Sequence, residues 1–297
     1  MFSVRKHGSF KNKKNNPKRN LDPCVLWDTL SEMEMTAYGV FSYKLKEFLQ
    51  PIRNCYGSAV QAITLKGERN NEKDIALASL FLKRSLNDLR SVWLLVNLGY
   101  TSQAATIAAS LFEYAAIVVC ITGNEENTKK IIKNRHGDSP WTARQLSQMI
   151  MKIENRENYE LAWREKYAVY KFFCKIKHPT ISSVSSDAIG TSLKRNEFVV
   201  MASPDLLNEN ISIKAIILTS CISDIFLATK RMIIGIHCDE STQDYKDCVG
   251  RLNNVISETI KAYKKIVSEY DLPFSIYGTN LEKEYYDLRY HATKVKN

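Results

Sequence analysis

The chain has 297 residues, enough to bury a sizeable core without disulfides or a structural metal, so its size gives no reason to expect a cofactor. Hydrophobic residues make up 44% and charged residues 25%, as in ordinary folded soluble proteins, and the formal net charge is +10. Residues 1–20 supply seven of these charges and leave only +3 for the rest, so the charge does not imply a basic face on the fold.

The segment 1–20 is rich in Asn, Lys and Arg and contains few apolar side chains, so it cannot bury enough surface to offset the entropy of ordering. We expect a disordered basic tail. Its cations could hold RNA or DNA through salt-dependent phosphate contacts, although only Phe2 and Phe10 could stack on bases, and a solvated tail is the alternative. The candidate nucleic-acid-binding residues are Arg5, Lys6, Lys11, Lys13, Lys14, Lys18 and Arg19.

Apolar residues recur at helical spacing over residues 21–272, and glycine and proline are few, which together predict an all-α, single-domain helical bundle. Pro51 should kink or split the first long helix. Asn71 and Asp74 resemble a capping box that opens the next helix, and Gly99 occupies the place of a left-handed C-cap. A short turn at Gly99 would fold the following helix back as a hairpin.

Residues 104–122 are almost entirely apolar or small, and the alanines among them would allow close approach between helices. A stretch of this length could also span a membrane. Glu113 lies at its midpoint, where a carboxylate would be costly in lipid, and we identify no second apolar stretch as a partner span. The pattern therefore favours a buried core helix and no membrane.

Cellular location is inferred from the cysteines and the start of the chain. The seven cysteines are odd in number and widely spaced, which favours reduced thiols over a disulfide framework. No apolar segment of a secretory signal precedes Asp22. We expect a cytoplasmic protein.

The second half of the chain is expected to continue the bundle. Asn124 should cap a short helix, and Ser139 with Pro140 should open another. The Ser- and Asn-rich residues 180–210 are expected to form an irregular insertion or functional loop. A second core helix is expected over 211–237, and residues 273–297 are expected to form a tail with a short docking helix.

Glu113 is the first candidate for chemistry. A carboxylate on an apolar helix must be paired or have a raised pKa, and such groups are candidates for acid or base catalysis. The structural interpretation, which we favour, is an ion pair with Arg84 or Arg90 on the preceding antiparallel helix.

A second candidate combines Cys174 and His178, whose spacing places them on one helical face, as half of a zinc site requires. His237 and Cys238 could supply further ligands. The alternative is that His178 lies at a helix C-terminus because the helix dipole favours it there. Because the ligands are not placed together by sequence, we predict neither a metal nor another cofactor.

The third candidate is Arg231 with His237, six residues apart. This pair resembles the Arg and His of HEPN-type ribonucleases, in which the site is usually completed across a dimer. The resemblance is weakly specific, because Met232 follows the arginine where those nucleases carry a polar residue. On a regular helix the two side chains would also point about 120° apart.

The segment from Leu86 to Thr122, with its Leu-Gly-aromatic turn and Leu-Phe-Glu, resembles an uncharacterised family of bacterial all-helical proteins. The His178-Pro179 element is similar to one that the same family carries at a helix end. Ala109 stands where the family often has Arg, which puts in doubt a site built from an Arg–Glu pair in that helix. The resemblance implies a loose relation to HEPN and abortive-infection proteins of phage defence.

No phosphate-binding glycine loop, nucleophile elbow, HExxH or paired CxxC motif is present. We therefore expect a helical protein that binds a protein partner or nucleic acid and has no demonstrable catalytic motif. The alternative is a HEPN-like endoribonuclease or toxin that uses Arg231 and His237 and acts as a homodimer.

Overall fold

The computed structural model describes residues 23–134, 137, 139–177, 204–206 and 210–270. Within these residues the chain forms α-helices and one short 3₁₀ turn, without any β-strand, which confirms the all-α prediction. The expected basic tail at 1–20, the docking helix within 273–297 and most of the irregular segment 180–210 lie outside the described residues.

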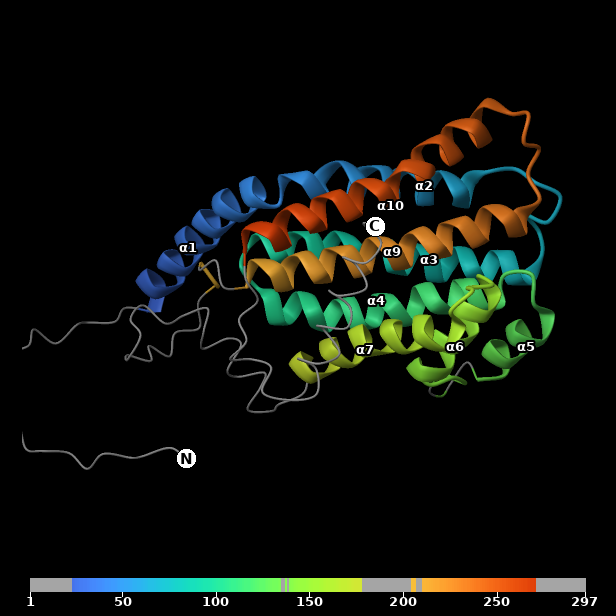
Figure 1. Ribbon diagram of the computed structural model, residues 1–297, viewed down its shortest axis with the longest axis horizontal. Coiled ribbons are helices and arrows are strands. Elements are labelled where there is room, and N and C mark those ends of the chain that lie inside the picture. Colours follow the sequence, from blue (N-terminus) through green and yellow to red (C-terminus); the bar gives the residue numbers. More distant parts are fainter. Residues whose placement is uncertain (1–22, 135–136, 138, 178–203, 207–209, 271–297) are drawn as a thin grey trace, which may run out of the picture.

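The helices run back and forth along one elongated bundle (Figure 1). In chain order they are α1 (Pro23–Lys44), the 3₁₀ turn η1 (Lys46–Phe48), α2 (Leu49–Thr64), α3 (Lys73–Asn97), α4 (Thr101–Ile121), α5 (Glu125–Lys133), α6 (Ala143–Ile153), α7 (Tyr159–Lys177), α9 (Ile211–Ile236) and α10 (Gln243–Glu269).

The two most apolar helices, α4 and α9, form the centre of the bundle. Helix α4 packs on α3, α9, α7 and α6, and α9 packs on α4, α10, α3 and α2. Each of the two is long and apolar enough to cross a membrane, and each lies mostly inside the protein. Helix α9 is therefore the second apolar stretch that the sequence argument against a membrane span had overlooked, so that part of the argument was wrong.

Glycine and proline mark the first helix boundaries as expected. Gly99 has a φ of +86° and reverses the chain between α3 and α4, which confirms the predicted hairpin. The break near Pro51 produces two helices, and Pro51 lies in the first turn of α2, where a missing N–H costs no helical hydrogen bond.

Two of the three predicted helix caps differ from the sequence interpretation. Asn124 caps α5 by accepting a hydrogen bond from Asn127 N at 2.9 Å, as predicted. The cap of α6 is Thr142, in a capping box with Gln145, instead of Ser139. Helix α3 begins after Glu72 without a side-chain cap, because the carboxylate of Asp74 is used in contacts with other elements.

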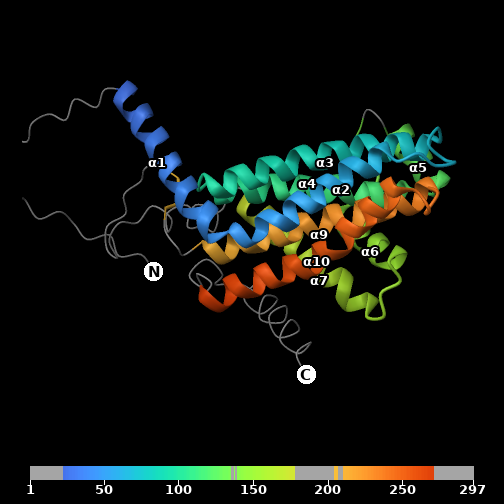
Figure 2. The ribbon, with the colours of Figure 1, turned by 90° about the horizontal axis from the view of Figure 1, so that it is seen from above.

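Helix α1 leaves the bundle at an angle and projects beyond its end (Figure 2). It packs mainly on α3 and η1, and Phe41 near its end also contacts Lys214 of α9. From Pro23 to Thr36 no described side chain is buried, whereas Ala37 and Phe41 enter the core. The stretch from Pro23 to Thr36 therefore adds no buried side chain to the core, and one of its contacts with the bundle is the hydrogen bond from Tyr100 to Glu34.

A fully buried lysine anchors the end of the bundle next to α1. Lys214 of α9 is 0% exposed and donates to the carboxylate of Asp205 at 2.6 Å, and its ammonium lies 4.0 Å from the ring centroid of Phe41. Asn210 and Thr101 donate to the same carboxylate oxygen. Burial lowers the pKa of Lys214, and the Asp205 charge opposes that shift. The network ties residues 204–206 to the start of α9.

We predict that Lys214→Met lowers the free energy of unfolding by about 3–5 kcal/mol, because it leaves the Asp205 carboxylate buried without its cation. Guanidinium unfolding followed by circular dichroism measures the change. Lys129→Met is the matched control, because the Lys129–Glu125 pair is exposed and its loss should leave the free energy of unfolding nearly unchanged. Equal effects of the two substitutions would contradict the assignment.

Candidate functional site

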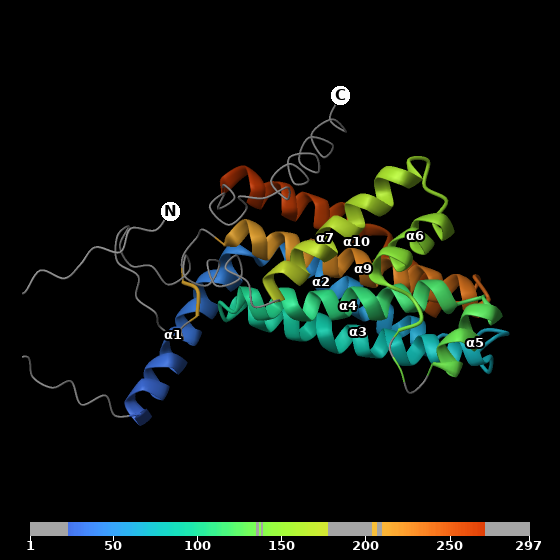
Figure 3. The same cartoon turned by 90° about the horizontal axis from the view of Figure 1, so that it is seen from below.

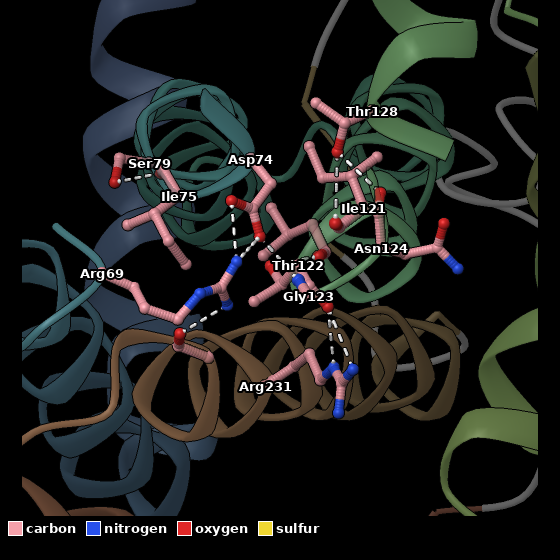
Figure 4. Close-up of polar contacts among 12 residues, drawn as sticks. Arg69, Asp74, Ile75, Ser79, Ile121, Thr122, Gly123, Asn124, Thr128 and Arg231 are labelled. Carbon is pink, nitrogen blue, oxygen red and sulfur yellow. Dashed lines mark hydrogen bonds and ion pairs between the residues drawn. The ribbon is translucent and has the colours of Figure 1, made fainter. Parts of the chain in front are cut away.

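The Arg231 side chain binds the end of a core helix. Its guanidinium donates two hydrogen bonds to the carbonyl of Thr122, through Nε at 3.2 Å and Nη2 at 3.0 Å (Figure 4). This carbonyl belongs to the last turn of α4, whose unpaired acceptors and dipole favour a cation. Arg231 thus stabilises the C-terminus of α4, a role that the sequence did not indicate.

A second arginine completes this cluster. Arg69 forms a bidentate ion pair with Asp74 at 2.9 and 3.1 Å and also donates to the carbonyl of Gly235 at 2.9 Å. Asp74 in turn accepts a hydrogen bond of 2.7 Å from the backbone N–H of Gly123 (Figure 4). The ends of α4 and α9 and the start of α3 are joined by these contacts.

His237 lies six residues after Arg231, but it does not complete a site with it. It is exposed, has a φ of +56° and forms the left-handed C-cap of α9, where its carbonyl accepts a hydrogen bond from Glu68 N. Arg231 points to Thr122 at the same time. Within the described residues this geometry gives the pair a capping role and brings no further catalytic group to it.

Glu113 faces α7 instead of α3. Its carboxylate accepts a hydrogen bond of 2.6 Å from the Tyr170 hydroxyl, and the expected ion pair with Arg84 or Arg90 is not formed. Arg84 instead approaches Asp88 at 3.6 Å and lies over the Tyr114 ring. Burial, and then the bond to Glu113, raises the pKa of Tyr170, so Tyr170 is a neutral phenol. The sequence interpretation was wrong because it chose arginines on the neighbouring antiparallel helix α3, whereas Glu113 lies on the face of α4 that packs on α7.

The zinc hypothesis gains no ligand cluster. Cys174 bonds to Tyr170, one turn before it on α7, and no group of three potential metal ligands occurs among the described residues. Helices α7 and α9 end at opposite ends of the bundle (Figure 1), which separates Cys174 from His237 and Cys238. His178 and the seven cations of the N-terminal segment lie outside the described residues.

Sequence reasoning missed an ion pair on the α9 surface that faces α7. Lys166 of α7 bonds to Asp224 of α9, whose side chain is only 3% exposed. Burial raises the pKa of Asp224, and Lys166 and Ser220 oppose that shift by bonding to the charged form. The sequence did contain a signal for this site, because Asp224 interrupts an apolar helix just as Glu113 does. Its partner Lys166 could not be identified from the sequence, because it is 58 positions away.

The projecting half of α1 exposes large apolar side chains. Trp27 is 70% exposed, Met35 68% and Val25 59%. The only acidic residues of α1 are Asp28, Glu32 and Glu34, and its first basic residue is Lys44 at the last turn. Asp28 and Glu32 are exposed, and Glu34 accepts a hydrogen bond from the Tyr100 hydroxyl at 2.5 Å. The surface is therefore both apolar and negatively charged.

Comparison of the chain with protein families, with curated proteins and with solved structures found no match. The resemblance to a bacterial all-helical family and to HEPN proteins consequently stays a prediction from the sequence. The class defined by the structure is an all-α bundle, and its function has to be argued from its own surfaces.

We predict opposite effects for the two residues of the Arg–His pair. Arg231→Met should lower the free energy of unfolding by about 1–3 kcal/mol, because the Thr122 carbonyl loses its donors. His237→Gly should raise it by up to about 1 kcal/mol, because glycine adopts a positive φ without strain. Chemical unfolding of the two variants measures both changes. If His237→Gly instead lowers the free energy of unfolding, the imidazole makes stabilising contacts in addition to the capping role of the backbone.

Asp88 generates a pH-dependent prediction. Its Oδ2 is buried without a hydrogen-bond partner among the described residues, and burial raises its pKa above the usual 3.8. The folded state then binds more protons than the unfolded state above about pH 4, so stability falls as pH rises through this window. Asp88→Asn should remove that loss and become more stable relative to the wild type as pH increases.

Unfolding curves recorded from pH 4 to 8 measure this dependence, and Asp239→Asn is the control. Hydrogen bonds from Ser241 lower the pKa of Asp239, so its contribution is present at neutral pH and is lost as pH falls. Over pH 4–8, Asp88→Asn should gain stability relative to the wild type, whereas Asp239→Asn should show no slope, because the Asp239 contribution is lost only below this range. An equally flat line for Asp88→Asn would contradict the burial argument for Asp88.

Proposed function

We propose that the chain is a helical binding module that docks a protein partner through the projecting half of α1. The observation that carries this proposal is the exposure of Val25, Trp27 and Met35 on a helix that leaves the bundle. Trp27 and Met35 lie about 80° apart around the helix axis and can share one face, whereas Val25 points to the opposite side. Exposed apolar side chains on one face are typical of interaction sites, and Trp and Met are enriched in protein–protein interfaces. A free surface of this kind would lose contact with water when a partner covers it.

The charges of α1 define the chemistry of the partner. Asp28 and Glu32 flank the apolar side chains, and no cation precedes Lys44 in the helix. On this face of α1 the carboxylates favour a protein surface with an apolar centre and a basic rim over an anionic ligand. We therefore assign the α1 surface to a protein partner. Nucleic-acid binding remains a separate prediction for the cations of residues 1–20.

The ribonuclease alternative receives no support from the described residues. Arg231 is engaged with the Thr122 carbonyl, and His237 caps α9. An active site made from this pair would have to release Arg231 from the helix end it stabilises, at the cost of two hydrogen bonds. Membership of a phage-defence system and a cytoplasmic location likewise stay predictions from the sequence.

The experiment places a photo-crosslinking amino acid at position 27 of the full chain, identifies the crosslinked protein and purifies it for titration calorimetry. We expect Trp27→Glu to weaken binding at least tenfold, because a central aromatic anchor typically contributes about 2 kcal/mol or more. The double variant Asp28→Lys with Glu32→Lys should also weaken binding, and it should do so less at high salt.

Leu80→Glu is the matched control, because Leu80 is 64% exposed on α3 and lies outside α1. It should bind as the wild type does. If Leu80→Glu and Trp27→Glu weaken binding of the partner equally, the effect is not specific to α1. Self-association of the pure chain that Trp27→Glu abolishes, measured by sedimentation, would replace the foreign partner with a second copy and overturn the proposal.

A further inference from the structure

A cavity of about 460 Å³ lies between α7 and α10 on the surface of α9. Helix α7 packs on α4 and α6, whereas α10 packs on α9 and α2, so the two helices leave part of α9 uncovered between them (Figure 3, seen from the α7 side). Cavities that bind small molecules generally measure about 300–1,000 Å³. The space is thus large enough for a small organic molecule and too small for a folded partner.

The surface of the cavity is mostly apolar, with polar side chains among its lining residues. Its apolar lining includes Val169 of α7 and Ile216 and Leu227 of α9. Lys166 also lines the cavity and forms an ion pair with Asp224, whose side chain is only 3% exposed. Asp224 is not among the lining residues, and its charge is balanced by Lys166.

Arg156 supplies a positive charge to the lining of the cavity. Arg156 lines the cavity and is exposed, and no carboxylate among the described residues forms an ion pair with it. A guanidinium binds a carboxylate with two parallel hydrogen bonds, which gives direction as well as affinity.

We propose that this cavity binds a small amphipathic carboxylate, with its apolar body between Val169 and Leu227 and its carboxylate on Arg156. The apolar walls supply the main driving force by removing the body of the ligand from water. Arg156 then selects a carboxylate over an amine or an alcohol of the same shape. The site is separate from the docking surface on α1, so each proposal can fail without the other.

The test titrates the full chain with three matched probes in a calorimeter, namely 4-phenylbutyrate, 4-phenylbutanol and 4-phenylbutylamine. We expect saturable 1:1 binding of the carboxylate, with the alcohol and the amine at least tenfold weaker. Arg156→Ala should weaken binding of the carboxylate about tenfold to a hundredfold and leave the alcohol unchanged. Arg164→Ala is the matched control, because Arg164 lies on α7 and pairs with Glu160 away from the cavity.

A filling substitution tests the location independently. Val169→Trp places a large side chain in the space and should abolish binding of all three probes, provided that circular dichroism shows an intact fold. If that variant does not fold, the comparison of Arg156→Ala with Arg164→Ala decides alone. Equal binding of the amine, unchanged affinity in Arg156→Ala, or no heat with 4-phenylbutyrate would each overturn the proposal.

Discussion

The mutual burial of α4 and α9 is the constraint on which the rest of the structure depends. These helices contain few charged residues, and most of their side chains are inside the protein. Near their ends the approach is closest, because a Cβ added to Gly235 would lie only 2.1 Å from Cγ2 of Thr122. Two helices without a polar face cannot lie on the surface of a bundle, so the amphipathic helices have to surround them.

Buried charges in this protein serve mainly to fasten the ends of that central pair. Lys214 and Asp205 hold the end from which α9 starts, and Arg69 with Asp74 holds the opposite end. Each charge is paired and further hydrogen-bonded, which is the condition under which burial of a charge is tolerated. The two surfaces that we propose for binding, on α1 and at Arg156, lie apart from these end contacts.

The sequence predicted helix positions well because apolar periodicity and the special backbone of glycine and proline are local properties. Gly99, Pro51 and Asn124 therefore acted where they were expected to act. The partners of buried polar groups were not predictable in this way. Glu113 bonds to Tyr170, 57 positions away, because the face of α4 that carries it is set by packing against α7 and not by chain order. Lys166 with Asp224, and the cavity above them, depend on the same tertiary geometry.

The order of the two central helices in the chain has a consequence for synthesis. Roughly ninety residues separate the end of α4 from the start of α9. At translation rates of about 5–20 residues per second, the face of α4 that α9 covers stays without its partner for about 5–20 s on each ribosome. During that time the α3–α4 hairpin can form, because its contacts are local. The nascent chain nevertheless exposes the apolar face of α4 until α9 has been synthesised, and chaperones bind segments of this kind.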